Sequence, residues 1–327
     1  MDLSIYQKIE DMFDIVNIQQ KGIAWRWLSA LLKLVLFCMA TLILVYLFFL
    51  PMQYLFDSLG IVVDASSGDF RDANPWLLSI NWLMMLLGTV AAVYVFRRFL
   101  DKRPLTTAGL HPYNWQNELP QGVLWGFVLI TLGFVLLLIA QQIKVIAFGV
   151  DLNQILGWMV FFFIAAAFEE VLFRGYIQSM FSEHISAKVG WYVSAVLFGL
   201  IHMANVNFSI LGGLNIILAG LVLGLVYLKT RRIWAATGLH FAWNYFQGTV
   251  YGFGVSGITT YQVIDIELVG NPLLTGGAFG FEGSILSILL LGGFIWWQRV
   301  VLMNPGSFRI ALEEIAEEEK DSEQVDS

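Results

Sequence analysis

Two adjacent glutamates inside an apolar stretch are the first residues of this sequence that could do chemistry. Glu169 and Glu170 lie near the end of residues 155–173, and Arg174 follows directly. Ionisable side chains within a membrane span are costly and commonly functional. Residues four apart are neighbours on one helix face, so we expect Glu170 and Arg174 to form an ion pair. Glu169 points elsewhere, about 100° around the helix, and is left as a carboxylate that could act as a general base.

Two other apolar stretches each carry a polar motif. One contains Phe198 and His202, and the other contains His240 and Asn244. His240 and Asn244 share one helix face, and an imidazole and an amide are suitable donors to a developing oxyanion. Each motif alone also fits a structural role, as an ion-pair staple, a packed histidine or a hydrogen bond between helices. Together with Glu169 they favour an active site over packing.

The depth of these residues in their spans supports one shared site. With a rise of about 1.5 Å per residue, Glu169 lies roughly 10 Å from the cytoplasmic end of its span, and His202 roughly 15 Å from the start of its own. His240 and Asn244 lie about 10 and 16 Å from the start of theirs. Helices running in different directions would therefore bring these groups to one level, which we predict to lie in the cytoplasmic half.

The composition requires a membrane protein to position these residues. Of 327 residues, 58% are hydrophobic and 13% are charged, against about 25% charged in an average soluble domain. This excludes a water-soluble globule and a disordered chain. The net charge of −7 argues against a nucleic-acid partner. The single cysteine, Cys38, excludes an intrachain disulfide framework and a cysteine-rich zinc cluster.

Hydropathy predicts an all-α, polytopic membrane protein with about eight transmembrane helices. A bilayer-crossing helix needs roughly 20 mostly apolar residues. The first stretch is too long for the apolar part of a signal peptide and lacks a cleavage pattern, so we expect an uncleaved span. The fifth is short and either extends at both ends or lies inside the protein. The eight stretches are residues 28–50, 76–96, 122–140, 155–173, 190–203, 210–228, 233–250 and 283–301.

The placement of Lys and Arg predicts that both termini lie in the cytoplasm. Fifteen of the 18 cations fall on one side of these spans, the opposite connections hold only Arg71 and Lys144, and Lys33 lies within the first span. We therefore divide the chain into a cytoplasmic segment 1–27, a membrane domain 28–302 and a cytoplasmic tail 303–327. The tail carries −6 of the total charge of −7, so the membrane domain is almost neutral. His111 and His184 lie in connections and are expected at the surface.

The three motifs, in this order, resemble those of the CAAX prenyl protease and bacteriocin-processing family, also called CPBP or Abi. The family pattern is E-E-x-x-x-R, then F-x-x-x-H, then H-x-x-x-N, and every position is matched within about residues 155–250. The resemblance implies an intramembrane endopeptidase. In that family Glu169 with His202 would activate a water, His240 and Asn244 would hold the oxyanion, and Arg174 would orient Glu170.

The sequence leaves the metal requirement open. Glu169, His202 and His240 could bind zinc through three ligands and keep one position open. The helical zinc signature H-E-x-x-H is absent. Glu169 could equally act as the base on an unbound water, and the place of Asn244 beside His240 favours this arrangement.

The expected partners are a membrane-associated peptide or protein substrate and the lipid bilayer, in the plasma membrane if the source is bacterial. Two other functions stay open. One is a non-catalytic immunity or scaffold protein of the same fold. The other is a proton-coupled transporter, because buried Glu and His side chains also form proton relays. A bis-histidine haem site is a more remote fourth.

Overall fold

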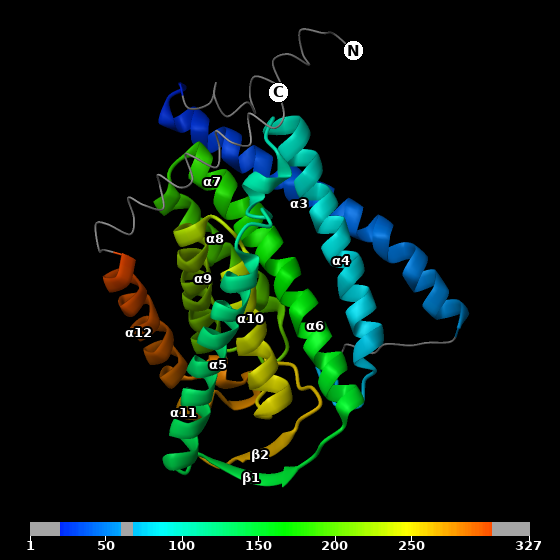
Figure 1. The fold of residues 1–327 in the computed structure, drawn as a ribbon, viewed down its shortest axis with the longest axis vertical. Coiled ribbons are helices and arrows are strands. Elements are labelled where there is room, and N and C mark those ends of the chain that lie inside the picture. Colours follow the sequence, from blue (N-terminus) through cyan, green and yellow to red (C-terminus); the bar gives the residue numbers. More distant parts are fainter. Residues whose placement is uncertain (1–19, 60–67, 303–327) are drawn as a thin grey trace.

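The computed structural model describes residues 20–59 and 68–302, and it is a bundle of helices (Figure 1). Within this part of the chain, six helices are long and apolar enough to cross a membrane. The chain is therefore an all-α, integral, multi-pass membrane protein, as predicted. The bounds of the main helices are α3 Ile23–Ser58, α4 Pro75–Val95, α5 Trp115–Ile139, α6 Leu152–Glu170, α8 Ala187–Ile201, α9 Ile210–Thr230, α10 Trp234–Tyr245 and α12 Ile285–Leu302.

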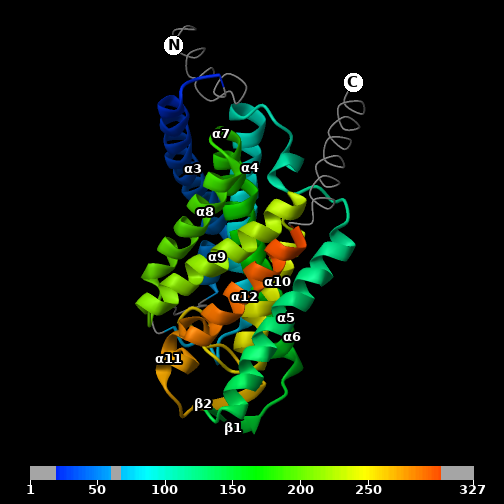
Figure 2. The ribbon, with the colours of Figure 1, turned by 90° about the vertical axis from the view of Figure 1, so that its left-hand side faces the viewer.

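Each of the eight predicted spans coincides with one of these helices, but the count of eight spans stays a prediction. The helices α10 and α12 are not among the six candidate membrane spans. A π-helical segment, Phe246–Val250, prolongs α10, and α12 packs across α9 and α5 (Figure 2). The predicted segment 1–27 is described only from residue 20, and the acidic tail 303–327 lies outside the described residues.

The helix that carries the two glutamates continues well past its predicted end. After α6, a π-helical segment, Val171–Gln178, leads into α7, Ser179–His184. Glu169 is therefore about 22 Å, rather than 10 Å, from this end of the helix, and the predicted depth is wrong. His202 follows the last residue of α8, also about 22 Å from the start of that helix.

Buried ionic groups explain why the continuation beyond Phe173 is polar and yet inside the fold. Arg97 contacts Glu183 at 2.8 Å and Asp101 at 3.3 Å, and Lys33 of α3 contacts Asp101 at 2.6 Å. His184 is fully buried among these elements, so its predicted surface position is wrong. These contacts fix α3 and the end of α4 against α7.

Glycines bring α5 and α10 into direct backbone contact. A Cβ at Gly122 would lie 2.0 Å from the carbonyl oxygen of Ala235, and one at Gly126 would lie 2.4 Å from that of Leu239. Since α10 carries His240, these glycines place the third motif relative to α5. The pair at residues 122 and 126 packs within the fold, as expected of small residues four apart.

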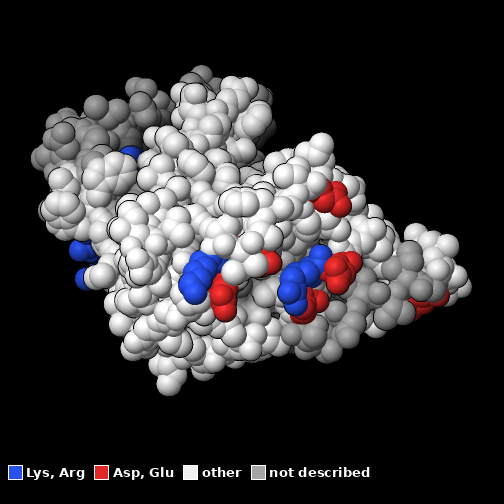
Figure 3. Space-filling view, turned by 90° about the horizontal axis from the view of Figure 1, so that it is seen from below, with Lys and Arg blue, Asp and Glu red and all other residues white. Residues whose placement is uncertain are grey.

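The end of the bundle away from the cationic connections is closed by a small sheet and a long connection. Strands β1 (Ile143–Phe148) and β2 (Ile264–Leu268) pair antiparallel. The sequence did not predict these strands. The connection 251–284 also contains the short helix α11, Pro272–Thr275. Few Lys and Arg side chains reach this face, which is shown in Figure 3.

Candidate active site

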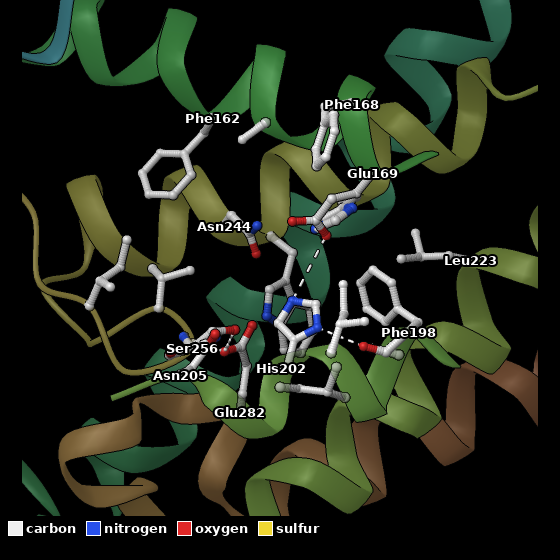
Figure 4. Close-up of a pocket in the computed structure, with 18 of the residues that line it drawn as sticks. Phe162, Phe168, Glu169, Phe198, His202, Asn205, Leu223, Asn244, Ser256 and Glu282 are labelled. Carbon is white, nitrogen blue, oxygen red and sulfur yellow. Dashed lines mark hydrogen bonds and ion pairs between the residues drawn. The ribbon is translucent and has the colours of Figure 1, made fainter. Parts of the chain in front are cut away.

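A cavity of about 550 Å³ collects the predicted site residues. Glu169, His202, His240 and Asn244 all line it. Figure 4 shows Glu169, His202 and Asn244 converging from α6, the end of α8 and α10. Its walls are otherwise mostly apolar, with Phe and Trp side chains from α4 and α6. A largely apolar cleft with a few convergent polar groups is the usual form of a ligand site.

Glu170 and Arg174 do not line the cavity but lie behind it. Both side chains are 0% exposed, and Arg174 Nη1 donates to Glu170 Oε1 at 2.7 Å. The second guanidinium nitrogen of Arg174 donates to the carbonyl of Gly220 in α9 at 3.2 Å. The predicted ion pair is therefore present, and it ties α6 to α9.

The buried glutamate also orients a site histidine. Glu170 Oε1 lies 2.9 Å from His240 Nδ1. A carboxylate accepts hydrogen bonds, so Nδ1 carries the proton and the Nε2 atom of neutral His240 is left unprotonated. That nitrogen faces Glu169, with Nε2 and Oε2 3.8 Å apart.

His202 is oriented in the same way by its own helix. Its Nδ1 lies 2.6 Å from the carbonyl oxygen of Phe198, so Nδ1 must donate and Nε2 is again left unprotonated. His202 Nε2 lies 3.9 Å from Glu169 Oε2. The Phe198 ring lies between the two histidines, 4.7 Å from the His202 ring and 5.8 Å from that of His240, and packs under the Arg174 guanidinium at 4.6 Å.

The histidine Nε2 atoms of the other two motifs thus both lie within 4 Å of Glu169 Oε2. In the described part of the chain its Oε2 atom has no hydrogen-bond partner. It is too far from both histidine nitrogens for direct hydrogen bonds. Because Glu169 Oε2 is itself buried, a water that contacts all three atoms requires a small shift of these side chains. Asn244, one turn after His240, also lines the cavity, and its amide makes no hydrogen bond to another described residue.

The donor atoms match those of a zinc site in type but not in spacing. Tetrahedral ligands at about 2.0–2.1 Å from zinc lie roughly 3.3–3.4 Å from one another, whereas Glu169 Oε2 is 3.8 and 3.9 Å from the two histidine nitrogens. Among the described residues, no group of three or more His, Cys, Asp and Glu side chains is arranged to hold a metal ion.

A second polar centre in the same cavity was not found from the sequence. Glu282 lines the cavity and accepts hydrogen bonds at Oε2 from the amide of Ser256 at 2.6 Å and from its hydroxyl at 2.8 Å. Burial raises the pKa of Glu282 above its ordinary value. The sequence signal that could have identified Glu282 was its position, as an acidic residue next to the last apolar stretch in a connection without Lys or Arg.

Comparison with known proteins agrees with the motifs. Residues 151–246 match the family model described as type II CAAX prenyl endopeptidase Rce1-like. No curated protein and no solved structure matches the chain. The matched segment contains all three motifs and ends before Glu282. The resemblance to the CAAX prenyl protease and bacteriocin-processing family is confirmed for this segment, and the family match supports a CAAX-protease-like endopeptidase in general terms.

Proposed function

We propose that this protein is an intramembrane endopeptidase that hydrolyses a peptide bond of a membrane-associated peptide or protein. The observation that carries the proposal is the position of Glu169 Oε2, 3.8 and 3.9 Å from two histidine Nε2 atoms. Both imidazoles are held through Nδ1, so each presents its other nitrogen to the same place. A carboxylate and two oriented imidazoles on the wall of an apolar cavity suit the activation of one water.

In this proposal Glu169 is the general base. It removes a proton from a water held near His202 Nε2, and the water oxygen forms a bond to the scissile carbonyl carbon. The carbonyl electron pair moves onto its oxygen and gives a tetrahedral oxyanion. When the carbonyl forms again, the C–N bond breaks and Glu169 returns the proton to the leaving nitrogen. The products are a new carboxyl end and a new amine.

Asn244 and His240 are the proposed oxyanion donors, with different requirements. The Asn244 amide can donate directly. His240 can donate from Nε2 only when both its ring nitrogens carry protons, because Nδ1 already donates to Glu170. The Glu170 carboxylate stabilises that cationic form. Arg174 acts through Glu170, and Phe198 through both imidazoles, so these three are positioning residues.

If zinc binds in some state of the enzyme, the residues to hold it are Glu169, His202 and His240, after a contraction of the observed spacing. Zinc would supply a polarised water at the same place.

The cavity lining supports substrate entry from the side of the β1–β2 sheet. Besides the helices, its wall contains residues of connections at the β1–β2 end, among them Phe70, Asn205 and Val255. No residue of the connections 101–114, 185–186 or 231–233 lines it. With both termini cytoplasmic, as the Lys and Arg placement predicts, the cavity extends toward the extracytoplasmic side. This differs from the predicted position of the site in the cytoplasmic half of the membrane.

The test is cleavage by purified protein in nanodiscs. Quenched-fluorescent peptides with apolar sequences are incubated with wild type, Glu169→Gln, His202→Ala and a matched control, Glu267→Gln, which alters an exposed carboxylate on β2. We expect hydrolysis by wild type and Glu267→Gln, and a loss of at least about 100-fold for the two site variants. Full cleavage by both site variants would show that the assignment is wrong. A partner captured equally by wild type and Glu169→Gln, without hydrolysis, would instead indicate a scaffold.

A further inference from the structure

The cavity contains a second carboxylate that the proposed reaction does not use. Glu282 lies in the connection before α12 and beside His202 in Figure 4. Ser256 fixes its Oε2 atom through two hydrogen bonds. No described residue donates to its Oε1 atom. The backbone around it is also held, because Asn205 Nδ2 donates to the carbonyl of Ser256 at 3.0 Å.

Two further acceptors near Glu282 are buried without partners. Asn215 of α9 is 1% exposed, and its Nδ2 donates to the carbonyl oxygens of Glu282 at 2.5 Å and Ser284 at 3.3 Å. The amide orientation is therefore set, and Asn215 Oδ1 is left unpartnered within the described chain. Ser287 of α12 is 0% exposed and its Oγ is likewise unpartnered. Both residues line the cavity.

The charge of the lining makes this arrangement selective. Of the described residues that line the cavity, Glu169 and Glu282 are the only ones with an acidic side chain, and none is Lys or Arg. Arg174 lies behind the wall and is paired with Glu170. A cavity with two carboxylates, an unpartnered amide oxygen and aromatic walls matches a ligand that brings hydrogen-bond donors and positive charge.

We propose that Glu282 is a specificity-determining residue that binds a cationic group of the substrate, the ammonium of a lysine or the guanidinium of an arginine at a fixed distance from the scissile bond. The proposal rests on the proposed function and names its substrate class: a peptide with apolar side chains and one basic residue, cut at an internal bond.

The experiment is a lysine scan. One lysine is moved along an otherwise neutral, apolar, quenched-fluorescent peptide with an amidated end, and norleucine takes its place in each matched control. The cut bond is identified by mass spectrometry. For wild type we expect kcat/KM to exceed that of the norleucine peptide by at least about tenfold at one position.

Two variants assign the preference to Glu282. Glu282→Gln keeps an acceptor for Ser256 but removes the charge, and the ratio of lysine to norleucine cleavage should fall toward one. Glu282→Lys should prefer glutamate over lysine at that position. The exposed-carboxylate control Glu267→Gln should keep the wild-type ratio. If Glu282→Gln lowered both rates equally and left the ratio unchanged, Glu282 would be structural only and the proposal would be overturned.

A binding measurement separates this proposal from the proposed function. The lysine and norleucine peptides are titrated onto Glu169→Gln and onto Glu169→Gln/Glu282→Gln in nanodiscs, where no turnover is needed. We expect the single variant to bind the lysine peptide at least about tenfold more tightly, and the double variant to bind both alike. Equal binding to the single variant would refute the role of Glu282 even if hydrolysis occurs. A retained binding preference without hydrolysis by wild type would refute the peptidase assignment alone.

Discussion

Glu170→Gln is predicted to destabilise the protein far more than its chemical similarity to wild type suggests. The replacement keeps the shape of the side chain and an acceptor for His240 Nδ1. It leaves the Arg174 guanidinium fully buried, and among the described residues only the Gly220 carbonyl still accepts a hydrogen bond from it. The Nε atom of Arg174 already has no partner within the described chain. The buried positive charge of Arg174 is then left without the negative charge of Glu170.

The size of the effect follows from that burial. Loss of one partner of a buried ion pair costs about 3–5 kcal/mol. Since about 1.4 kcal/mol is a factor of ten, the unfolding constant should rise by roughly two to three and a half orders of magnitude. The double variant Glu170→Leu/Arg174→Met removes both charges and should recover most of this stability, because apolar residues of similar volume replace buried pairs well.

Stability is measured by unfolding in mixed micelles of increasing SDS content, followed by tryptophan fluorescence. The exposed variant Glu267→Gln should unfold like wild type. Peptidase activity is measured beside it, and the double variant is expected to fold but to lose activity because His240 has lost its anchor. This account of the pair would be refuted if Glu170→Gln lowered the free energy of unfolding by less than about 1 kcal/mol. It would also be refuted if the double variant were less stable than Glu170→Gln.

Three other predictions follow from the fold and the site. Gly122→Ala should place a Cβ 2.0 Å from the Ala235 carbonyl oxygen, shift α10 and lower kcat/KM at least about tenfold. The control Gly292→Ala in α12, where a Cβ meets nothing within 4 Å, should keep the wild-type kcat/KM. Equal activity of the two variants would contradict the role of this contact. Chelation by 1,10-phenanthroline, with the metal content measured, should leave peptide hydrolysis unchanged, and a loss of activity restored by zinc would show that the site contracts around a metal. In a Cys38→Ser background, Glu267→Cys on β2 should react with an impermeant maleimide added outside intact cells. Lys188→Cys should react with the same reagent only after the cells are lysed. The reverse pattern would place the cavity on the cytoplasmic side.

Sequence reasoning predicted the parts of the site that depend on helical spacing. Glu170 and Arg174 are four positions apart, as are His240 and Asn244, so each pair had to share a face in any continuous helix. Both pairs do, and Glu170 with Arg174 forms the predicted ion pair at 2.7 Å. The eight apolar stretches likewise coincide with helices, because in lipid a helix satisfies its own backbone groups.

The errors arose where polar residues are buried by contacts distant in sequence. Hydropathy falls after Phe173, so the helix was expected to end there, but Arg97 and Lys33 pair with the acidic groups around α7 and keep it inside. The same contacts bury His184. Glu282 was missed because Ser256 and Asn215, which define its surroundings, come from other parts of the fold.

The charged residues at the site fall into two groups, one buried behind the cavity and one on its wall. Glu170 and Arg174 are fully buried and compensate each other, so they can hold a proton position on His240 without facing substrate. The Phe198 carbonyl does the same for His202. Glu169 and Glu282 lack such compensation and line the cavity. A carboxylate without a charged partner in an apolar wall destabilises the fold, unless a bound group offsets the free-energy cost of its burial. The family motif accounts for one of the two, and a basic substrate residue accounts for the other.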